Sequence, residues 1–163
     1  MRILSRSFLG LAVLLLIAIN AQTQGAAGGK SAVGSWKLNV DKSDFGSNPK
    51  PKSGSVTVSA DSAASLKWHG SITSADGKTE TYRFSGAEDG KQHPVTGNNS
   101  WKSAAYTRSD SGMSSESVIQ KDGGTQKNDF SWSDDGNTLT VKGSNGTTEI
   151  WERVKGKPAK SKS

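Results

Sequence analysis

Apolar and polar residues alternate with a period of two along most of the chain after residue 32. The segments 36–40 (WKLNV), 66–72 (LKWHGSI) and 82–84 (YRF) show this alternation, which is typical of β-strands with one buried face. The same rule predicts further inward residues, namely Val56, Val58, Phe130, Trp132, Leu139, Val141, Ile150 and Val154. The segments 100–108 and 113–121 alternate poorly, so their inward faces stay open.

Glycine-containing dipeptides that tolerate a positive φ separate these segments. They are Asp76-Gly77, Asp89-Gly90, Ser111-Gly112, Asp122-Gly123, Asp135-Gly136 and Asn145-Gly146, and most lie 10 to 13 residues apart. The wide gap between Gly90 and Gly112 predicts a further turn near Gly97. Such short spacing indicates a meander of successive antiparallel hairpins.

A meander of this kind has two sheet edges to hide, and closure into a barrel removes both. We therefore predict an all-β fold, an up-and-down antiparallel meander of about 8 to 10 strands closed into a barrel over residues 33–154. A two-sheet sandwich is the alternative, but sandwiches usually need longer crossover connections. The one long connection, residues 41–54, is long enough to fold over one barrel mouth as a lid.

The two ends of the chain differ from this pattern. Residues 1–21 combine a basic start, an uncharged apolar run over 8–19 and a small residue at the end, which predicts a secretory signal peptide. Residues 22–32 are rich in Gly and Ala and predict a flexible arm, and residues 155–163 form a basic tail. The chain has no cysteine, so we expect a periplasmic or secreted bacterial protein with no integral membrane segment after signal cleavage.

The net charge of +6 suggests a nucleic-acid partner until the charges are located. Seven of the 21 basic residues lie in the signal, the arm or the tail, which leaves 14 basic against 15 acidic residues over 31–154. Because the predicted barrel is nearly neutral, we expect no nucleic-acid binding.

The predicted barrel contains few aliphatic residues, with only Leu38, Leu66 and Leu139 as leucines after residue 21. Its interior must therefore depend on aromatic rings, which either fill the lumen as a simple core or surround a cavity. In the second case the candidate ligand-binding residues are Trp68, Tyr82, Phe84, Phe130 and Trp132. Both interpretations stay open.

Candidate chemistry beyond this is sparse. His69 and His93 are the only histidines and lack zinc-ligand spacing, and the acidic segments 41–44 and 134–137 fit turns better than calcium loops. We expect no metal and no cofactor. The chain has no nucleophile elbow and no phosphate-binding loop, so we expect a protein that is not an enzyme. A carboxylate pair that only folding brings together stays open.

Four features occur together: Gly34-Ser35-Trp36 at the head of the first strand, a long loop after it, a run of hairpins, and Arg153 in the final strand. In this the chain resembles the calycin superfamily, in particular lipocalin-like barrels. The resemblance implies that Trp36 sits at the barrel floor, that Arg153 packs across its ring, and that a small, often apolar ligand binds inside. The chain also resembles small secreted bacterial proteins of uncharacterised role, through G-x-W-K-L-N at 34–39 and D-G-K-x-x-P-V-T-G at 89–97.

The leading hypothesis is an exported lipocalin-like protein that binds a small apolar or amphipathic ligand in its barrel. One alternative is a protein-interaction module such as a periplasmic protease inhibitor, with residues 22–32 as its free arm. Another is a structural, envelope-associated domain without a pocket, tethered by its basic tail. The sequence indicates no particular protein partner.

Overall fold

The computed structural model describes residues 30–155. The predicted signal peptide, residues 22–29 of the predicted arm and residues 156–163 of the tail lie outside the described residues. The described chain forms ten strands: β1 (Gly34–Leu38), β2 (Ser53–Ser62), β3 (Ser65–Thr73), β4 (Thr79–Gly86), β5 (His93–Thr96), β6 (Trp101–Ser109), β7 (Gly112–Gln120), β8 (Thr125–Trp132), β9 (Thr138–Gly143) and β10 (Thr148–Arg153).

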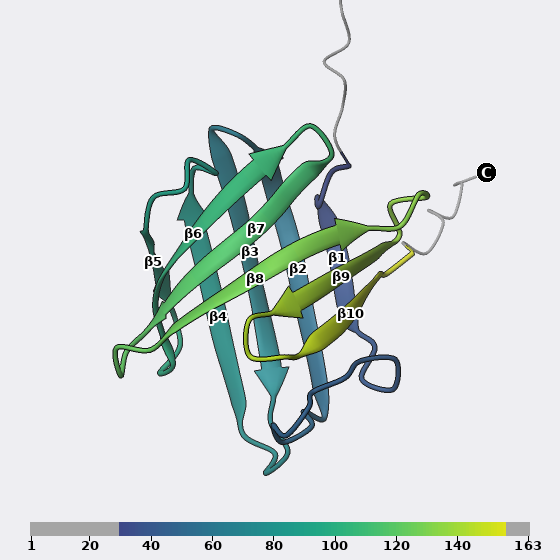
Figure 1. The fold of residues 1–163 in the computed structure, drawn as a ribbon, viewed down its shortest axis with the longest axis vertical. Helices are drawn as coiled ribbons and strands as arrows, with labels where there is room; N and C mark the ends of the chain where they lie inside the picture. Colours follow the sequence, from purple (N-terminus) through teal and green to yellow (C-terminus); the bar gives the residue numbers. More distant parts are fainter. Residues whose placement is uncertain (1–29, 156–163) are drawn as a thin grey trace, which may run out of the picture.

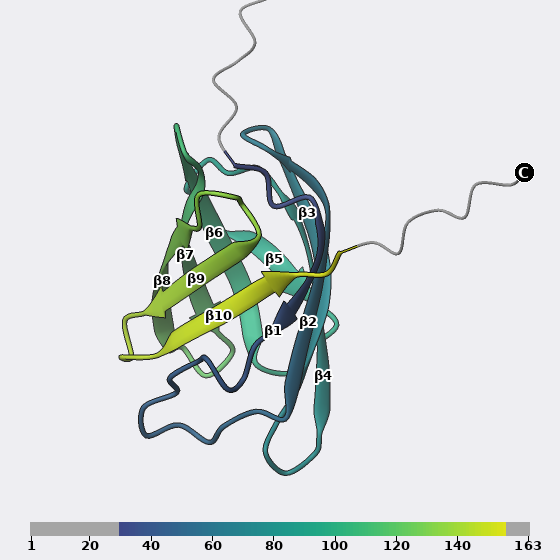
Figure 2. The same cartoon turned by 90° about the vertical axis from the view of Figure 1, so that its right-hand side faces the viewer.

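Each strand pairs antiparallel with the next, and β1 pairs with β10 to close the barrel (Figures 1 and 2). In the closing pair Trp36 lies opposite Arg153 and Leu38 lies opposite Trp151. The predicted all-β meander closed into a barrel is therefore confirmed. Within residues 30–155 there is no helix that is long and apolar enough to cross a membrane.

The predicted turns are present between the strands. All six dipeptide glycines have a positive φ, and so does Gly97, at φ 80°, in the additional turn predicted between β5 and β6. These turns set the register of each hairpin and hence which residues face the lumen.

The inward faces agree with the alternation in most strands but not in β10. Ile150 and Val154 were predicted to point inward, and this prediction is wrong: Val154 is exposed, whereas Trp151 is buried. Neighbouring residues of a strand point to opposite faces. Burying the large indole of Trp151 against Leu38 therefore turns Ile150 outward and brings Glu149 and Arg153 inward with the indole.

The two strands whose faces the sequence left open are irregular for a structural reason. In β6 three successive residues, Ala104, Ala105 and Tyr106, are buried, and the pairing with β7 shifts register twice. In β7 one of the buried positions is occupied by the polar residue Glu116. A rule based on alternating hydrophobicity cannot find either feature.

A long connection, residues 39–52, crosses the lower end of the barrel between β1 and β2 (Figure 2). Asp44 exchanges two backbone hydrogen bonds with Thr148, with N–O distances of 2.8 and 2.7 Å, and Phe45 is buried in the core. The predicted lid, residues 41–54, is thus a cover fastened to the start of β10, and its last two residues already belong to β2.

A second cover lies at the upper end, where residues 30–33, the N-terminal strap, lead into β1 (Figure 2). Lys30 donates a backbone hydrogen bond to Ser111 at 3.0 Å, and the Ala32 amide donates to the Asp61 carboxylate. Ala32 is 1% exposed. Contacts with the barrel therefore begin three residues before the predicted start at Val33.

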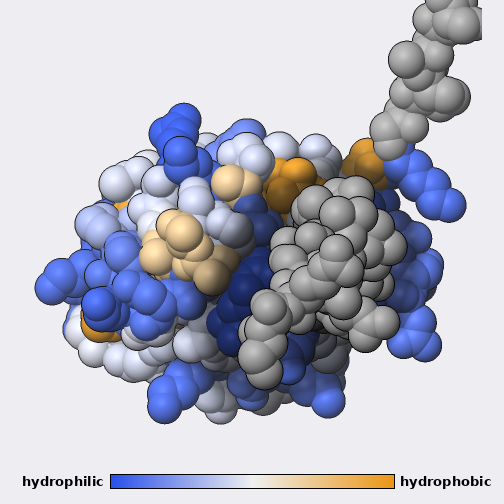
Figure 3. Space-filling view, turned by 90° about the horizontal axis from the view of Figure 1, so that it is seen from above, coloured by the Kyte–Doolittle hydropathy of each residue, from blue (hydrophilic) through white to orange (hydrophobic). Residues whose placement is uncertain are grey.

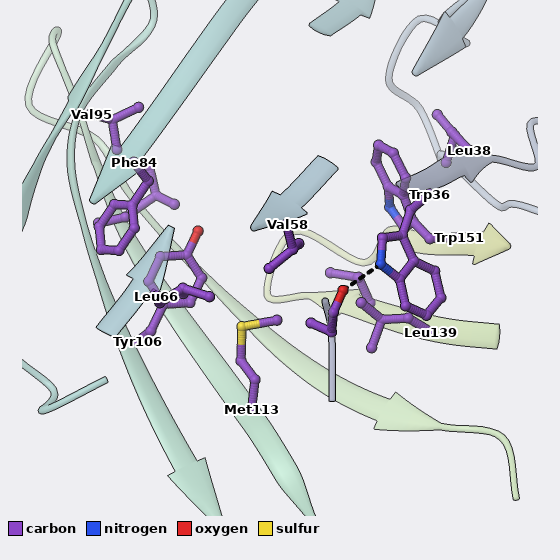
Figure 4. Close-up of a cluster of buried hydrophobic side chains, with 14 of the residues drawn as sticks. Trp36, Leu38, Val58, Leu66, Phe84, Val95, Tyr106, Met113, Leu139 and Trp151 are labelled. Atoms are coloured by element: carbon purple, nitrogen blue, oxygen red, sulfur yellow. Dashed lines mark hydrogen bonds between the residues drawn. The ribbon is translucent and has the colours of Figure 1, made fainter. Parts of the chain in front are cut away.

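The core is one cluster of buried side chains, and Figure 4 shows Val58 and Met113 lying between two sets of its members. One set contains Leu66, Phe84, Val95 and Tyr106, and the other contains Trp36, Leu38, Leu139 and Trp151. The outer surface seen from above is largely hydrophilic, with small separate hydrophobic patches (Figure 3). Among the described residues, Val33 and Val154 are the exposed large hydrophobic side chains.

Candidate functional site

The lumen contains a cavity of about 170 Å³, so the rings do not fill it completely. Six aromatic residues line the cavity: Trp36, Trp68, Trp101, Tyr106, Phe130 and Trp151. The aliphatic lining residues are Ala32, Val56, Val58, Leu66, Met113, Leu139 and Val141. The polar lining residues are Glu116, Gln126, Asn128, Thr147 and Glu149.

Two of the five predicted ligand-binding residues, Trp68 and Phe130, line this cavity. The other three are not lining residues and lie in a second layer behind the wall. Phe84 stacks on Trp68 with ring centroids 6.0 Å apart, and Tyr82 packs on Trp101 at 5.1 Å. Trp132 meets Trp36 edge-on at 5.7 Å.

Two of these second-layer residues are also held by polar contacts. The Trp132 indole nitrogen donates to the backbone oxygen of Met113 at 3.1 Å, and the Tyr82 hydroxyl donates to Glu80 at 2.7 Å. They therefore fix the positions of the lining residues and do not themselves reach the cavity.

Sequence reasoning missed several lining residues. Trp101, Tyr106 and Glu116 belong to the strands whose faces could not be assigned, and Glu149 and Trp151 belong to β10, whose face was assigned wrongly. A signal was available for Trp151, because the pairing of Trp36 with an inward Arg153 requires Trp151 to point inward too. No sequence signal identifies Glu116 as a lumen residue.

A row of directly paired residues crosses the lumen wall from β6 to β9, through Tyr106, Glu116, Asn128 and Gly143. The Tyr106 hydroxyl donates to one Glu116 oxygen, and the Asn128 side-chain amide donates to the other at 2.6 Å. Gln126 in turn donates to the Asn128 oxygen at 2.9 Å. This row is a polar band across an otherwise apolar wall.

Gly143 lies at the β9 end of this band, and its lack of a side chain leaves room for the neighbouring polar groups. A Cβ atom there would lie 2.6 Å from the Thr147 hydroxyl and 3.2 Å from the Asn128 side-chain oxygen. Both contacts are closer than real Cβ atoms normally make. The missing side chain thus lets Asn128 and Thr147 reach the lumen.

The second carboxylate of the cavity is Glu149, on β10. One of its oxygens accepts a hydrogen bond from the Trp151 indole nitrogen at 2.9 Å. Its other oxygen, Oε1, makes no hydrogen bond to any described residue. Folding has therefore brought together a carboxylate pair, Glu116 and Glu149, that are 33 positions apart in the sequence.

Burial is the main cause of altered protonation in this site. It raises the pKa of Glu116, and the Glu149 charge raises that pKa further, against the lowering effect of the hydrogen bonds from Tyr106 and Asn128. Burial likewise raises the pKa of Glu149. The pKa of the Tyr106 hydroxyl also lies well above its ordinary value, because of burial and the neighbouring Glu116. Both carboxyls thus take a proton more readily than a carboxyl in water.

The signature residues Gly34, Trp36 and Arg153 meet at the closing seam between β1 and β10. The Arg153 guanidinium lies 4.3 Å from the centroid of the Trp36 ring, and it donates to the backbone oxygens of Val33, Ser31 and Gly136. Gly34 has a φ of 135°, and a Cβ atom there would lie 2.7 Å from the guanidinium. The Trp36 nitrogen donates to Ala32 at 2.7 Å (Figure 4).

Neither histidine lines the cavity. His69 is exposed on the outer face of β3, and His93 hydrogen-bonds Asp89 at 3.1 Å. Among residues 30–155 no group of three or more His, Cys, Asp or Glu side chains is arranged to hold a metal ion.

In comparisons with family models and with curated proteins, no match to the chain was found. The closed antiparallel barrel of ten strands is consistent with a calycin or lipocalin-like fold. The site must therefore be interpreted from its own geometry.

Proposed function

We propose that this protein is an exported bacterial barrel of the lipocalin-like kind that binds a small apolar or amphipathic molecule in its lumen. The observation that carries the proposal is the cavity of about 170 Å³ between six aromatic side chains. A small barrel either fills its interior with side chains or holds one small ligand, and the cavity favours the second. An apolar pocket with a few convergent polar groups is the usual form of a ligand site.

The volume limits the size of the ligand. An engineered apolar cavity of about 150 Å³ binds benzene, whereas pockets for drug-sized molecules measure about 300 to 1,000 Å³. The proposed ligand therefore has one aromatic ring or a short chain. Ala32 of the N-terminal strap lines the cavity, so the strap would cover one side of such a guest.

Three further parts of the proposal rest on the sequence. The signal-like residues 1–21 and the lack of cysteine support export to the periplasm or the medium. The G-x-W and Arg153 pattern supports kinship with lipocalin-like barrels. The proposed role is binding without catalysis, since the side chains of the cavity serve as walls and as hydrogen-bonding partners for a guest.

A cavity-filling variant tests whether the ligand enters the lumen. Val58 lines the cavity and is 6% exposed, so Val58→Phe places a ring in the space that the ligand would occupy. Titration with small aromatic compounds, followed by tryptophan fluorescence, is expected to give a saturable response for the unmodified protein. The variant is expected to lose about tenfold or more in affinity.

The matched control is Ser55→Phe, which adds the same ring on the outer face of the same strand, where residue 55 is exposed. It is expected to bind like the unmodified protein, with far-UV circular dichroism confirming that both variants fold. Equal affinities for all three proteins, or no response from the unmodified protein to any compound, would contradict binding in the lumen.

A further inference from the structure

We infer that the ligand of this lumen is a small organic cation, a protonated amine carried on an apolar or aromatic body. This inference rests on the proposed function and specifies the chemistry of its ligand. Three properties of the cavity support it: the sign of its charge, an acceptor atom without a donor, and the aromatic faces around it.

The ionisable side chains in the wall can form charge of only one sign at neutral pH. Two carboxylates, Glu116 and Glu149, line the cavity, and none of the described lining residues is a lysine, an arginine or a histidine. A buried charge is costly unless it is paired. Elsewhere in the barrel the buried carboxylates have such a partner, because Asp61 and Glu88 both pair with Arg108. Inside the lumen a bound ammonium group would supply the corresponding positive charge.

The hydrogen bonds of the two carboxylates indicate a different role for each in binding an ammonium group. Both oxygens of Glu116 already accept hydrogen bonds, from Tyr106 and Asn128, which fixes the side chain in the wall. Glu149 accepts one hydrogen bond on Oε2, whereas Oε1 has no donor among the described residues. An ammonium group has three donors and no acceptor. Glu149 Oε1 is therefore its direct partner, and Glu116 adds the field of a second negative charge.

The remaining walls suit the rest of such a ligand. Trp68 and Trp101 meet edge-on at 6.4 Å, and Tyr106 and Phe130 lie parallel at 6.5 Å. The faces of aromatic rings attract cations and also bury apolar groups. Burial raises the pKa of both carboxyls. A cation that binds beside them offsets this effect, because an adjacent opposite charge favours the ionised form.

Isothermal titration calorimetry with matched ligands tests the inference. The probes are 2-phenylethylamine as the cation, 2-phenylethanol as its neutral counterpart and phenylacetate as an anion, all built on the same ring. At pH 7 the amine is expected to bind about tenfold or more tightly than the alcohol, and phenylacetate is expected to bind most weakly.

Glu149→Gln keeps the shape of the side chain and removes its charge. It is expected to lower amine affinity about tenfold and leave alcohol affinity unchanged. Glu152→Gln is the matched control, because Glu152 lies on the same strand, outside the cavity, and pairs with Lys42 at 2.8 Å. This control is expected to bind the amine like the unmodified protein.

Two kinds of result would contradict the cation inference, and one of them would also contradict the proposed function. Binding of the alcohol or phenylacetate as tightly as the amine would overturn the inference and leave the proposed function intact, as would amine binding that Glu149→Gln does not weaken. Failure of all three probes to bind the unmodified protein would overturn both. Because the ligand series uses the unmodified protein, it stays decisive even where a variant does not fold.

Discussion

Arg153 connects the first strand, the last strand and the N-terminal strap. Its guanidinium covers the Trp36 ring and donates to backbone oxygens of Ser31, Val33 and Gly136. Four partners are thus held by one planar group, which suits arginine because its donors form a rigid fork. Lysine could supply the charge at this position but not the fork.

Arg153→Ala is expected to lower the free energy of unfolding by about 2 to 4 kcal/mol, because it removes the stacking on Trp36 and several charge-assisted hydrogen bonds. Arg83→Ala is the control, since Arg83 is exposed on β4 and is expected to cost less than about 0.5 kcal/mol. Urea unfolding of both variants gives the comparison. Equal, small effects would show that Arg153 does not hold the seam.

The strands follow from local sequence rules wherever polar residues point outward. The turns, the meander, the closure and the apolar inward residues of β2 and β8 were predictable from alternation and from glycine positions, whereas the polar inward residues Gln126 and Asn128 of β8 were not. The rules failed where the lumen itself is polar, as at Glu116 and Glu149, and where β10 buries Trp151 instead of Ile150. A functional cavity needs polar inward residues, so a pattern based on hydrophobicity loses information there.

The strap depends on a close approach between the backbones of Lys30 and Gly112. Gly112 has a φ of 113°, and a Cβ atom there would clash with the Lys30 backbone oxygen. Gly112→Ala is therefore expected to displace the strap and lower the free energy of unfolding by about 2 to 3 kcal/mol.

Gly136→Ala is the control that separates the cost of a positive φ from the cost of a steric clash. Gly136 also has a positive φ, 67°, but nothing lies within 4 Å of its added Cβ. It is expected to cost only about 1 kcal/mol, the usual penalty of a left-handed residue. Hydrogen exchange at Ala32 measures release of the strap, which is expected in Gly112→Ala alone. Protection of Ala32 that both variants leave unchanged would refute the proposed clash.

Among the described residues the barrel buries acidic side chains, Glu88 and Glu116, but no basic one. At the upper end Asp61 and Glu88 share Arg108, with a distance of 2.7 Å from its Nε to Glu88. Burial, followed by the neighbouring Asp61, raises the pKa of Glu88 to about 7. Burial also raises the pKa values of Glu116 and Glu149 in the lumen. All three acids therefore link stability to pH in the same direction.

The direction in which stability changes with pH follows from the pKa of Glu88 in the folded and the unfolded protein. The pKa of Glu88 is about 7 in the folded protein and about 4.3 in an unfolded chain, so the folded state holds the proton more tightly. The stabilising contribution is complete below about pH 4.3 and is lost as the pH rises through 7. The protein is expected to be more stable in urea at pH 5 than at pH 8.

Glu88→Gln is expected to reduce this pH dependence and leave the part that comes from Glu116 and Glu149. Glu152→Gln is the control, because Glu152 is paired with Lys42 and its pKa is lowered, so it titrates below the window from pH 5 to 8. The urea midpoints of the unmodified protein and of both variants, measured at pH 5 and pH 8, give the pH dependence of stability for each protein. A protein that is more stable at pH 8 than at pH 5 would contradict this assignment.

The most direct test of the account is a crystal structure of the unmodified protein grown with 2-phenylethylamine. We predict electron density for the ligand inside the barrel, with its ring among Trp68, Trp101 and Phe130 and its nitrogen beside Glu149. A lumen filled by its own side chains, or a ligand bound only on the outer surface, would contradict the claim that this barrel encloses a binding site.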